Sequence, residues 1–228
     1  MKYYKKAALV LLGMSAACVG TSAYAGVVVS NGVVTATGDH LTYTFNEVDL
    51  GLFGPLSSVS LTGNSLNFAP TGFSAASPGA GLTDWSMQIT VTAHQGYRLS
   101  SFGLVEGGSF TSGGTFDATG IFGVQDNYAP NSNALSVGFS GTFSGTGWTA
   151  QTGAILPGAG WGNGGLFNDA TLTIENMLVA VAGGSISKEF ITISAVAVPV
   201  PEAHAYAMML AGLGLIGFMV RRRGDASA

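Results

Sequence analysis

Carboxylates that lie close together in the sequence are the first candidates for chemistry. Asp117 and Asp126 flank one short segment, and Glu47 and Asp49 flank a single valine. Two carboxylates that met across a cleft could hydrolyse a glycosidic bond. Sequence spacing does not bring them together, and acids on protein surfaces are common. We therefore expect no enzymatic activity, and a secreted hydrolase is the weakest of the functions considered.

Oxygen donors gather in one predicted loop, residues 126–133, with the sequence DNYAPNSN. Asp126, Asn131 and Asn133 offer the hard oxygen ligands that Ca²⁺ takes. The segment lacks the spacing and the closing glutamate of an EF-hand, and an asparagine-rich turn has the same composition. It is a weak calcium candidate, and the sequence predicts no other metal or cofactor.

Three aromatic residues, Trp148, Trp161 and Tyr128, fall in glycine-rich segments. Aromatic rings exposed in loops could stack on sugars, whereas tryptophan is often buried. Exposed rings in a common plane would indicate a carbohydrate-binding module. Burial of Trp148 and Trp161 in the core would exclude that use of them.

The composition limits the partners. Glycine supplies 35 of 228 residues and charged residues only 9%, yet 47% of the chain is hydrophobic, so the chain can bury a core. Between Gly26 and Glu202 only Arg98 and Lys188 are basic, against eleven acids. With no basic patch to follow a phosphate backbone, we expect no nucleic-acid partner.

Period-two alternation of apolar residues indicates β-strands with one buried face. Met87, Ile89 and Val91 share one side of such a segment. Further sets with this alternation are Leu41, Tyr43 and Phe45; Leu135, Val137 and Phe139; Leu172 and Ile174; and Ile191, Ile193, Ala195 and Ala197. Glycine, asparagine and proline clusters separate them. The pattern predicts an all-β, antiparallel, jelly-roll-like β-sandwich over residues 26–197.

Residues 1–25 have the order of a secretory signal peptide. Three lysines precede an apolar run, and Ala23 and Ala25 provide the small residues that a signal peptidase reads before Gly26. The only cysteine, Cys18, lies within this segment. Cleavage before Gly26 would leave a chain without thiols, which excludes disulfides and cysteine-based zinc sites.

The C-terminal segment, residues 198–228, combines a proline-bounded linker, an apolar stretch and three arginines. Residues 203–220 carry no formal charge, and as a helix they would span about 27 Å, close to the hydrocarbon core of a bilayer. The cluster Arg221, Arg222 and Arg223 would stop transfer and stay in the cytoplasm. We expect a transmembrane helix here, with the β domain on the opposite side of the membrane.

This segment resembles the PEP-CTERM sorting signal of Gram-negative bacteria. The resemblance rests on Pro199, on Pro201 and Glu202, and on the apolar helix and arginines that follow; Ala203 replaces the second proline of the Pro-Glu-Pro signature. Residues 89–110 and 171–182 are similar to strands of β-sandwich substrates of the same sorting system.

The resemblance implies that the protein is exported, held briefly in the inner membrane by its tail, and processed near the motif by exosortase. It is then released or attached at the cell surface or in the extracellular matrix, in bacteria that make exopolysaccharide and biofilm. We expect a structural or adhesive role, with exopolysaccharide as a candidate partner. A carbohydrate-binding module is the alternative.

Overall fold

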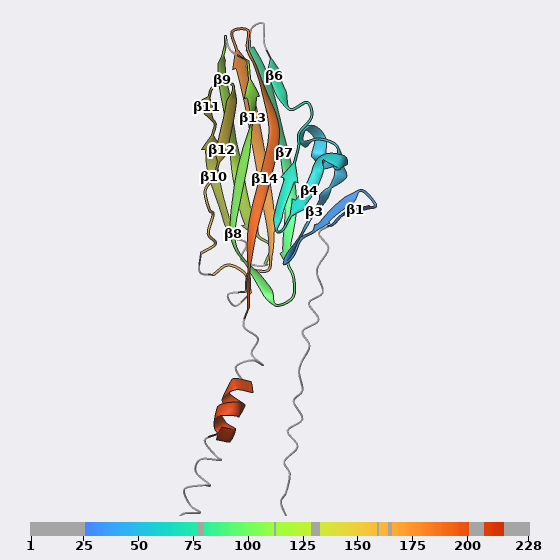
Figure 1. The fold of residues 1–228 in the computed structure, drawn as a ribbon, viewed down its shortest axis with the longest axis vertical. Coiled ribbons are helices and arrows are strands. Elements are labelled where there is room, and N and C mark those ends of the chain that lie inside the picture. Colours follow the sequence, from blue (N-terminus) through green and yellow to red (C-terminus); the bar gives the residue numbers. More distant parts are fainter. Residues whose placement is uncertain are drawn as a thin grey trace, which may run out of the picture.

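Fourteen strands in two antiparallel sheets make up the described body of the chain (Figure 1). The structure is a computed structural model that describes residues 26–76, 80–111, 113–128, 133–158, 160–163, 166–200 and 208–216. The signal segment 1–25 lies outside these residues. The predicted all-β class with two antiparallel sheets is confirmed, while the jelly-roll connectivity stays a prediction.

Seven strands form the first sheet, called sheet A. In hydrogen-bonded order they are β1 (Gly26–Ser30), β2 (Val33–Thr37), β3 (Leu41–Asn46), β7 (Ala80–Ala93), β13 (Asp169–Val181), β9 (Thr115–Asp126) and β10 (Ala134–Ser140).

The second sheet, sheet B, has the order β11 (Thr142–Ser144), β12 (Gly147–Gln151), β8 (Tyr97–Phe110), β14 (Ser185–Pro199), β5 (Ser65–Phe68) and β4 (Val59–Thr62). The short β6 (Ser74–Ala76) also pairs with β14. Two 3-10 helices, η1 (Glu47–Phe53) and η2 (Leu56–Ser58), connect β3 to β4.

The last two strands lie inside the sheets, with a neighbouring strand on each side. β13 lies between β7 and β9 in sheet A, and β14 lies between β8 and β5 in sheet B. Each is a long strand whose apolar residues alternate, so each buries one face along most of its length. The two sheets are therefore completed only when the C-terminal part of the domain is in place.

The inner faces of the two sheets share one hydrophobic core. The ring of Phe45 in β3 lies 5.9 Å from that of Phe68 in β5, and Phe110 in β8 lies 5.1 Å from Phe116 in β9. These contacts join sheet A to sheet B at both ends of the core.

The buried faces follow the sequence pattern on the central strands but not on β10. Met87, Ile89 and Val91 are buried, as predicted. On β10 only Phe139 is buried, whereas Leu135 is 42% exposed. β10 is an edge strand, and no part of the described core covers Leu135. The prediction of one continuous buried face was wrong for this strand.

Candidate functional site

The sorting segment follows directly from the central strand of sheet B. β14 ends at Pro199, opposite Tyr97, and the Val200 N–H donates a hydrogen bond of 2.8 Å to the Gly96 carbonyl. The domain therefore extends slightly beyond the predicted boundary at Ala197. Pro201, Glu202, Ala203 and the arginines 221–223 lie outside the described residues, as do Ala23 and Ala25. Gly26 is the first residue of β1.

A helix covers residues 208–216, within the segment where a membrane helix was expected. Its Met208, Leu210 and Leu213 side chains are more than half exposed, and no described element packs against them. Within the described residues, no helix has both the length and the apolar character needed to cross a membrane. The remainder of the predicted 203–220 helix lies outside the described residues.

The two tryptophans proposed to contact sugar are core residues. Trp148 lies on strand β12, not in a loop, and is 2% exposed; its Nε1–H donates to the Ser187 carbonyl at 3.0 Å. Trp161 is 7% exposed and packs edge-on against Phe167. Neither ring can stack on a sugar, so this interpretation is wrong for both. Tyr128 is exposed, but alone it forms no aromatic platform.

Asp126, the central residue of the calcium candidate, is buried, and its carboxylate accepts hydrogen bonds from backbone N–H groups. Its two carboxylate oxygens accept hydrogen bonds from the N–H groups of Tyr128 (2.9 Å) and Gly162 (2.5 Å). Asn133 donates its Nδ2–H to the Gly160 carbonyl at 3.1 Å, and Asn131 lies outside the described residues. The described residues contain no cluster of three or more metal-ligating side chains. These hydrogen bonds hold the two loops together.

The acid pairs considered from the sequence do not meet. Asp117 and Asp126 lie on the same strand, β9, where they pair with Val179 and Ala170 near opposite ends of β13. Glu47 and Asp49 lie on η1, where Asp49 accepts a hydrogen bond from the Asn46 side chain at 3.2 Å. Neither pair faces a common cleft.

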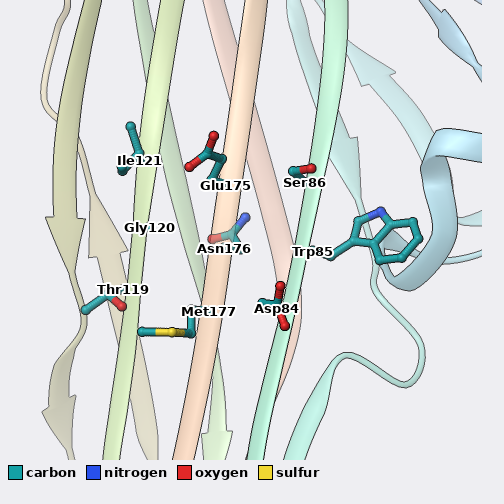
Figure 2. Close-up of a pocket in the computed structure, with 9 residues that line it drawn as sticks. All are labelled: Asp84, Trp85, Ser86, Thr119, Gly120, Ile121, Glu175, Asn176 and Met177. Carbon is teal, nitrogen blue, oxygen red and sulfur yellow. The ribbon is translucent and has the colours of Figure 1, made fainter.

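A different pair of carboxylates lines a groove on sheet A that the sequence did not reveal. The groove has a volume of about 440 Å³ and crosses β7, β13 and β9 (Figure 2). The strand register places six side chains of equal parity side by side: Ser86, Glu175 and Ile121 in one row, and Asp84, Met177 and Thr119 in the next.

The third tryptophan, Trp85, is among the residues that line this groove, but its ring does not face it. Figure 2 shows the Trp85 ring turned away from β13 toward the neighbouring 3-10 helix. Its Nε1–H donates to the Asp49 carbonyl at 3.0 Å, and the ring rests against Gly51, where no side chain would fit. The groove is thus a polar surface with two apolar side chains and no aromatic platform.

A second feature missed from the sequence is a polar cluster inside the core. Glu106 on β8 and Lys188 on β14 form an ion pair of 2.7 Å, and their side chains are 1% and 0% exposed. Asn176 on β13, in the opposite sheet, is 3% exposed. The Lys188 Nζ lies over the rings of Phe73 (4.8 Å) and Trp148 (5.7 Å).

Burial dominates the ionisation of this cluster. Loss of solvation raises the pKa of the Glu106 carboxyl above its usual range, opposed by the Lys188 charge and by the nearby Asn176 amide. It lowers the pKa of Lys188 to about 8, opposed by Glu106. Neither polar atom of the Asn176 side chain has a hydrogen-bond partner of good geometry among the described residues. Both titratable groups are therefore pushed toward their uncharged forms.

Comparison with known families identifies the tail. The family model of the PEP-CTERM protein-sorting motif matches residues 197–223. The match begins within β14, three residues before Val200, and includes the described helix. Comparison of the whole chain with curated proteins gives no match. The protein thus carries a C-terminal PEP-CTERM sorting motif, which indicates export and sorting by exosortase.

Proposed function

We propose that the protein is an exported structural component of the cell surface or extracellular matrix, placed there by exosortase processing of its tail. The observation that carries this proposal is the sorting motif at residues 197–223, directly after the last strand of the domain. Pro201 and Glu202 come directly after Val200, whose N–H still pairs with the Gly96 carbonyl of the domain.

The route that we propose has three stages. The leader is removed before Gly26, and the tail then holds the protein in the inner membrane of a Gram-negative cell. Exosortase finally cleaves near Glu202 and the β domain is released or attached outside. The exposed methionine and leucine side chains of the 208–216 helix support the membrane stage, since a helix apolar on all sides is stable only when it is buried.

The role of the domain itself is proposed to be structural or adhesive, and not enzymatic, in a biofilm rich in exopolysaccharide. Two sheets with a continuous core make a rigid body, and the long central strands leave little of the domain in loops. A shallow groove on a sheet suits an extended chain better than a small substrate.

The groove favours a second, narrower function, which is binding of a polysaccharide chain. Carboxylates and hydroxyls can hydrogen-bond sugar hydroxyls, and Ile121 and Met177 offer apolar contact. Asp84 and Glu175 would repel an anionic polymer, so the ligand proposed is a neutral polysaccharide. The same two carboxylates are the pair that a hydrolase would need, and the binding experiment below also measures cleavage.

Intact mass of the protein made with and without the processing enzyme tests the sorting proposal. With exosortase present, we expect a form that begins at Gly26 and ends near Glu202. Without the enzyme, that form is lost and Arg223 is retained. Equal retention of Arg223 in both strains would contradict the proposal.

A further inference from the structure

The buried cluster brings an amine, a carboxyl and a carboxamide into the space between the sheets. Glu106 and Lys188 come from neighbouring strands of sheet B, and Asn176 comes from the inner face of sheet A. Glu106 contacts Lys188 at 2.7 Å and also lies close enough to the Asn176 amide to be stabilised by it. One carboxyl group therefore contacts the amine and lies near the amide.

We propose that Lys188 and Asn176 are joined by an intramolecular amide bond, formed spontaneously in the folded core with Glu106 as the proton-transfer group. The bond links Nζ of Lys188 to Cγ of Asn176. It connects β14 of one sheet to β13 of the other.

The core provides the conditions for this reaction. An amine is a nucleophile only when it is uncharged, and the complete burial of the Lys188 side chain disfavours its charge. Transfer of its proton to Glu106 gives a neutral amine beside a carboxylic acid. Holding the reacting groups in one place removes the entropic cost of their encounter.

The atoms and protons balance without any further reagent. The Lys188 nitrogen attacks Cγ of Asn176, and the Glu106 acid donates its proton to Oδ1 as the tetrahedral intermediate forms. Glu106 then accepts a proton from the attacking nitrogen and delivers it to Nδ2. The bond from Cγ to Nδ2 breaks and ammonia leaves, while Oδ1 returns its proton to Glu106 and the carbonyl forms again. The products are one secondary amide, one ammonia molecule and a protonated Glu106.

The reaction also removes buried polar groups that would otherwise reduce the stability of the fold. A buried carboxamide without good hydrogen bonds and a buried charge pair both oppose folding. The new bond removes the Asn176 amino group and the Lys188 charge from the core. It also supplies a covalent tie to a domain whose residues 26–197 contain no cysteine.

Trypsin digestion and mass measurement of the full chain test the proposal, because trypsin requires a free lysine amine. In the linked protein, the peptide 99–221 stays continuous and is lighter by one ammonia molecule. In an unlinked protein, trypsin cuts after Lys188 and gives the peptides 99–188 and 189–221 at their full masses, which would overturn the proposal.

Asn-Gly sequences provide a necessary control. Asn31-Gly32 and Asn163-Gly164 can also lose ammonia by cyclising, but this leaves Lys188 cleavable. A loss of ammonia together with cleavage after Lys188 therefore also counts against the bond.

Two variants separate the role of Glu106 from a general effect of charge. Glu106→Gln keeps the shape of the side chain but cannot accept and return the proton, so we expect the full mass and complete cleavage after Lys188. Glu189→Gln, next to Lys188 but exposed, should give the same linked peptide as the natural protein. If the Glu106→Gln protein were still linked, Glu106 would not be the proton-transfer group. If the Glu106→Gln protein does not fold, the digest of the natural protein still decides whether the bond exists.

Discussion

Lys188 Nζ lies 2.7 Å from Oε2 of Glu106 inside the hydrophobic core, with both side chains withdrawn from solvent. An ion pair in such a place is held together strongly but is expensive to bury. Its two members lie on adjacent strands of sheet B, and Lys188 belongs to β14, the strand that leads into the sorting tail. The consequences for stability can be measured with the variants below.

Replacing one member of the ion pair should lower the stability of the fold more than replacing both. In Lys188→Met, the Glu106 carboxyl loses its counter-charge, and we expect a destabilisation of about 3–5 kcal/mol relative to the double variant Lys188→Met with Glu106→Leu. Both proteins lack Lys188, so neither can form the cross-link, and urea unfolding compares them directly. Equal urea midpoints for the single and double variants would show that Glu106 becomes protonated without loss of stability.

The pH dependence of stability should reveal whether Lys188 is free. Burial lowers the pKa of Lys188 to about 8, from an ordinary value of 10.5, and we expect this lowered pKa to persist in Asn176→Ala, which cannot be linked. Between these values the unfolded chain binds more protons, so the free energy of unfolding rises with pH, by at most about 1.4 kcal/mol per unit.

The useful window for this measurement closes near pH 10. Burial raises the pKa of Tyr43 above its ordinary value of 10.0, so ionisation of that tyrosine in the unfolded chain opposes stability beyond this point. Glu106 has a raised pKa, so its effect on the free energy of unfolding begins in a separate range, above pH 4.5. A linked natural protein should show no rise between pH 8 and 10, and a rise equal to that of the variant would contradict the link.

The buried and exposed aromatics should behave differently on truncation. Trp161→Ala empties a core site beside Phe167 and should lower stability by about 3–5 kcal/mol. Tyr128→Ala removes an exposed ring and should change stability by less than about 0.5 kcal/mol. Chemical denaturation measures both. Polysaccharide binding by folded Trp161→Ala should be unchanged, and its loss without loss of stability would restore the sugar-stacking interpretation.

Groove residues should determine binding of a neutral polysaccharide. Glu175→Ala and Asp84→Ala should each weaken retention in affinity electrophoresis by several-fold, because each removes an acceptor for sugar hydroxyls. Asp39→Ala, exposed in a turn away from the groove, is the matched control. Release of reducing sugar by the natural protein, lost in Glu175→Ala, would instead identify a hydrolase.

Restoring the second proline of the signature should increase processing. Ala203→Pro biases Glu202, the residue before it, toward extended backbone and prevents the helix from extending back through Glu202. We expect a larger ratio of cleaved to uncleaved protein by intact mass in cells that contain exosortase. A proline placed at Ala226, beyond the arginines, should have no effect. A lower ratio in Ala203→Pro would show that the enzyme reads Ala203 itself.

Strand periodicity predicted the β class and most of the central buried faces, because β7, β13 and β14 are covered on one side along their length. It failed for Leu135, since alternation does not reveal that β10 is an edge strand. It also placed Trp148 in a loop, because glycines at 145 and 147 bound a strand of only five residues.

The polar cluster illustrates a different limit. Asn176 has the same parity as Ile174 and Leu178, and Glu106 the same parity as Leu104, so both could have been recognised as inward-facing. Lys188 has the parity of the buried Ile186 but not of Ile191, because a register shift between Lys188 and Phe190 breaks the alternation. The meeting of the three residues depends on strand order, which one sequence does not reveal.

The continuity of β14 with the tail determines how the domain bears force. A load applied at the tail enters at Pro199 and pulls along a strand held by β8 on one side and by β5 and β6 on the other. Ladder hydrogen bonds lie across that direction, so many must shear together before the strand moves. Because the tail continues from an interior strand, a force on the tail acts on the part of the domain that most resists mechanical unfolding.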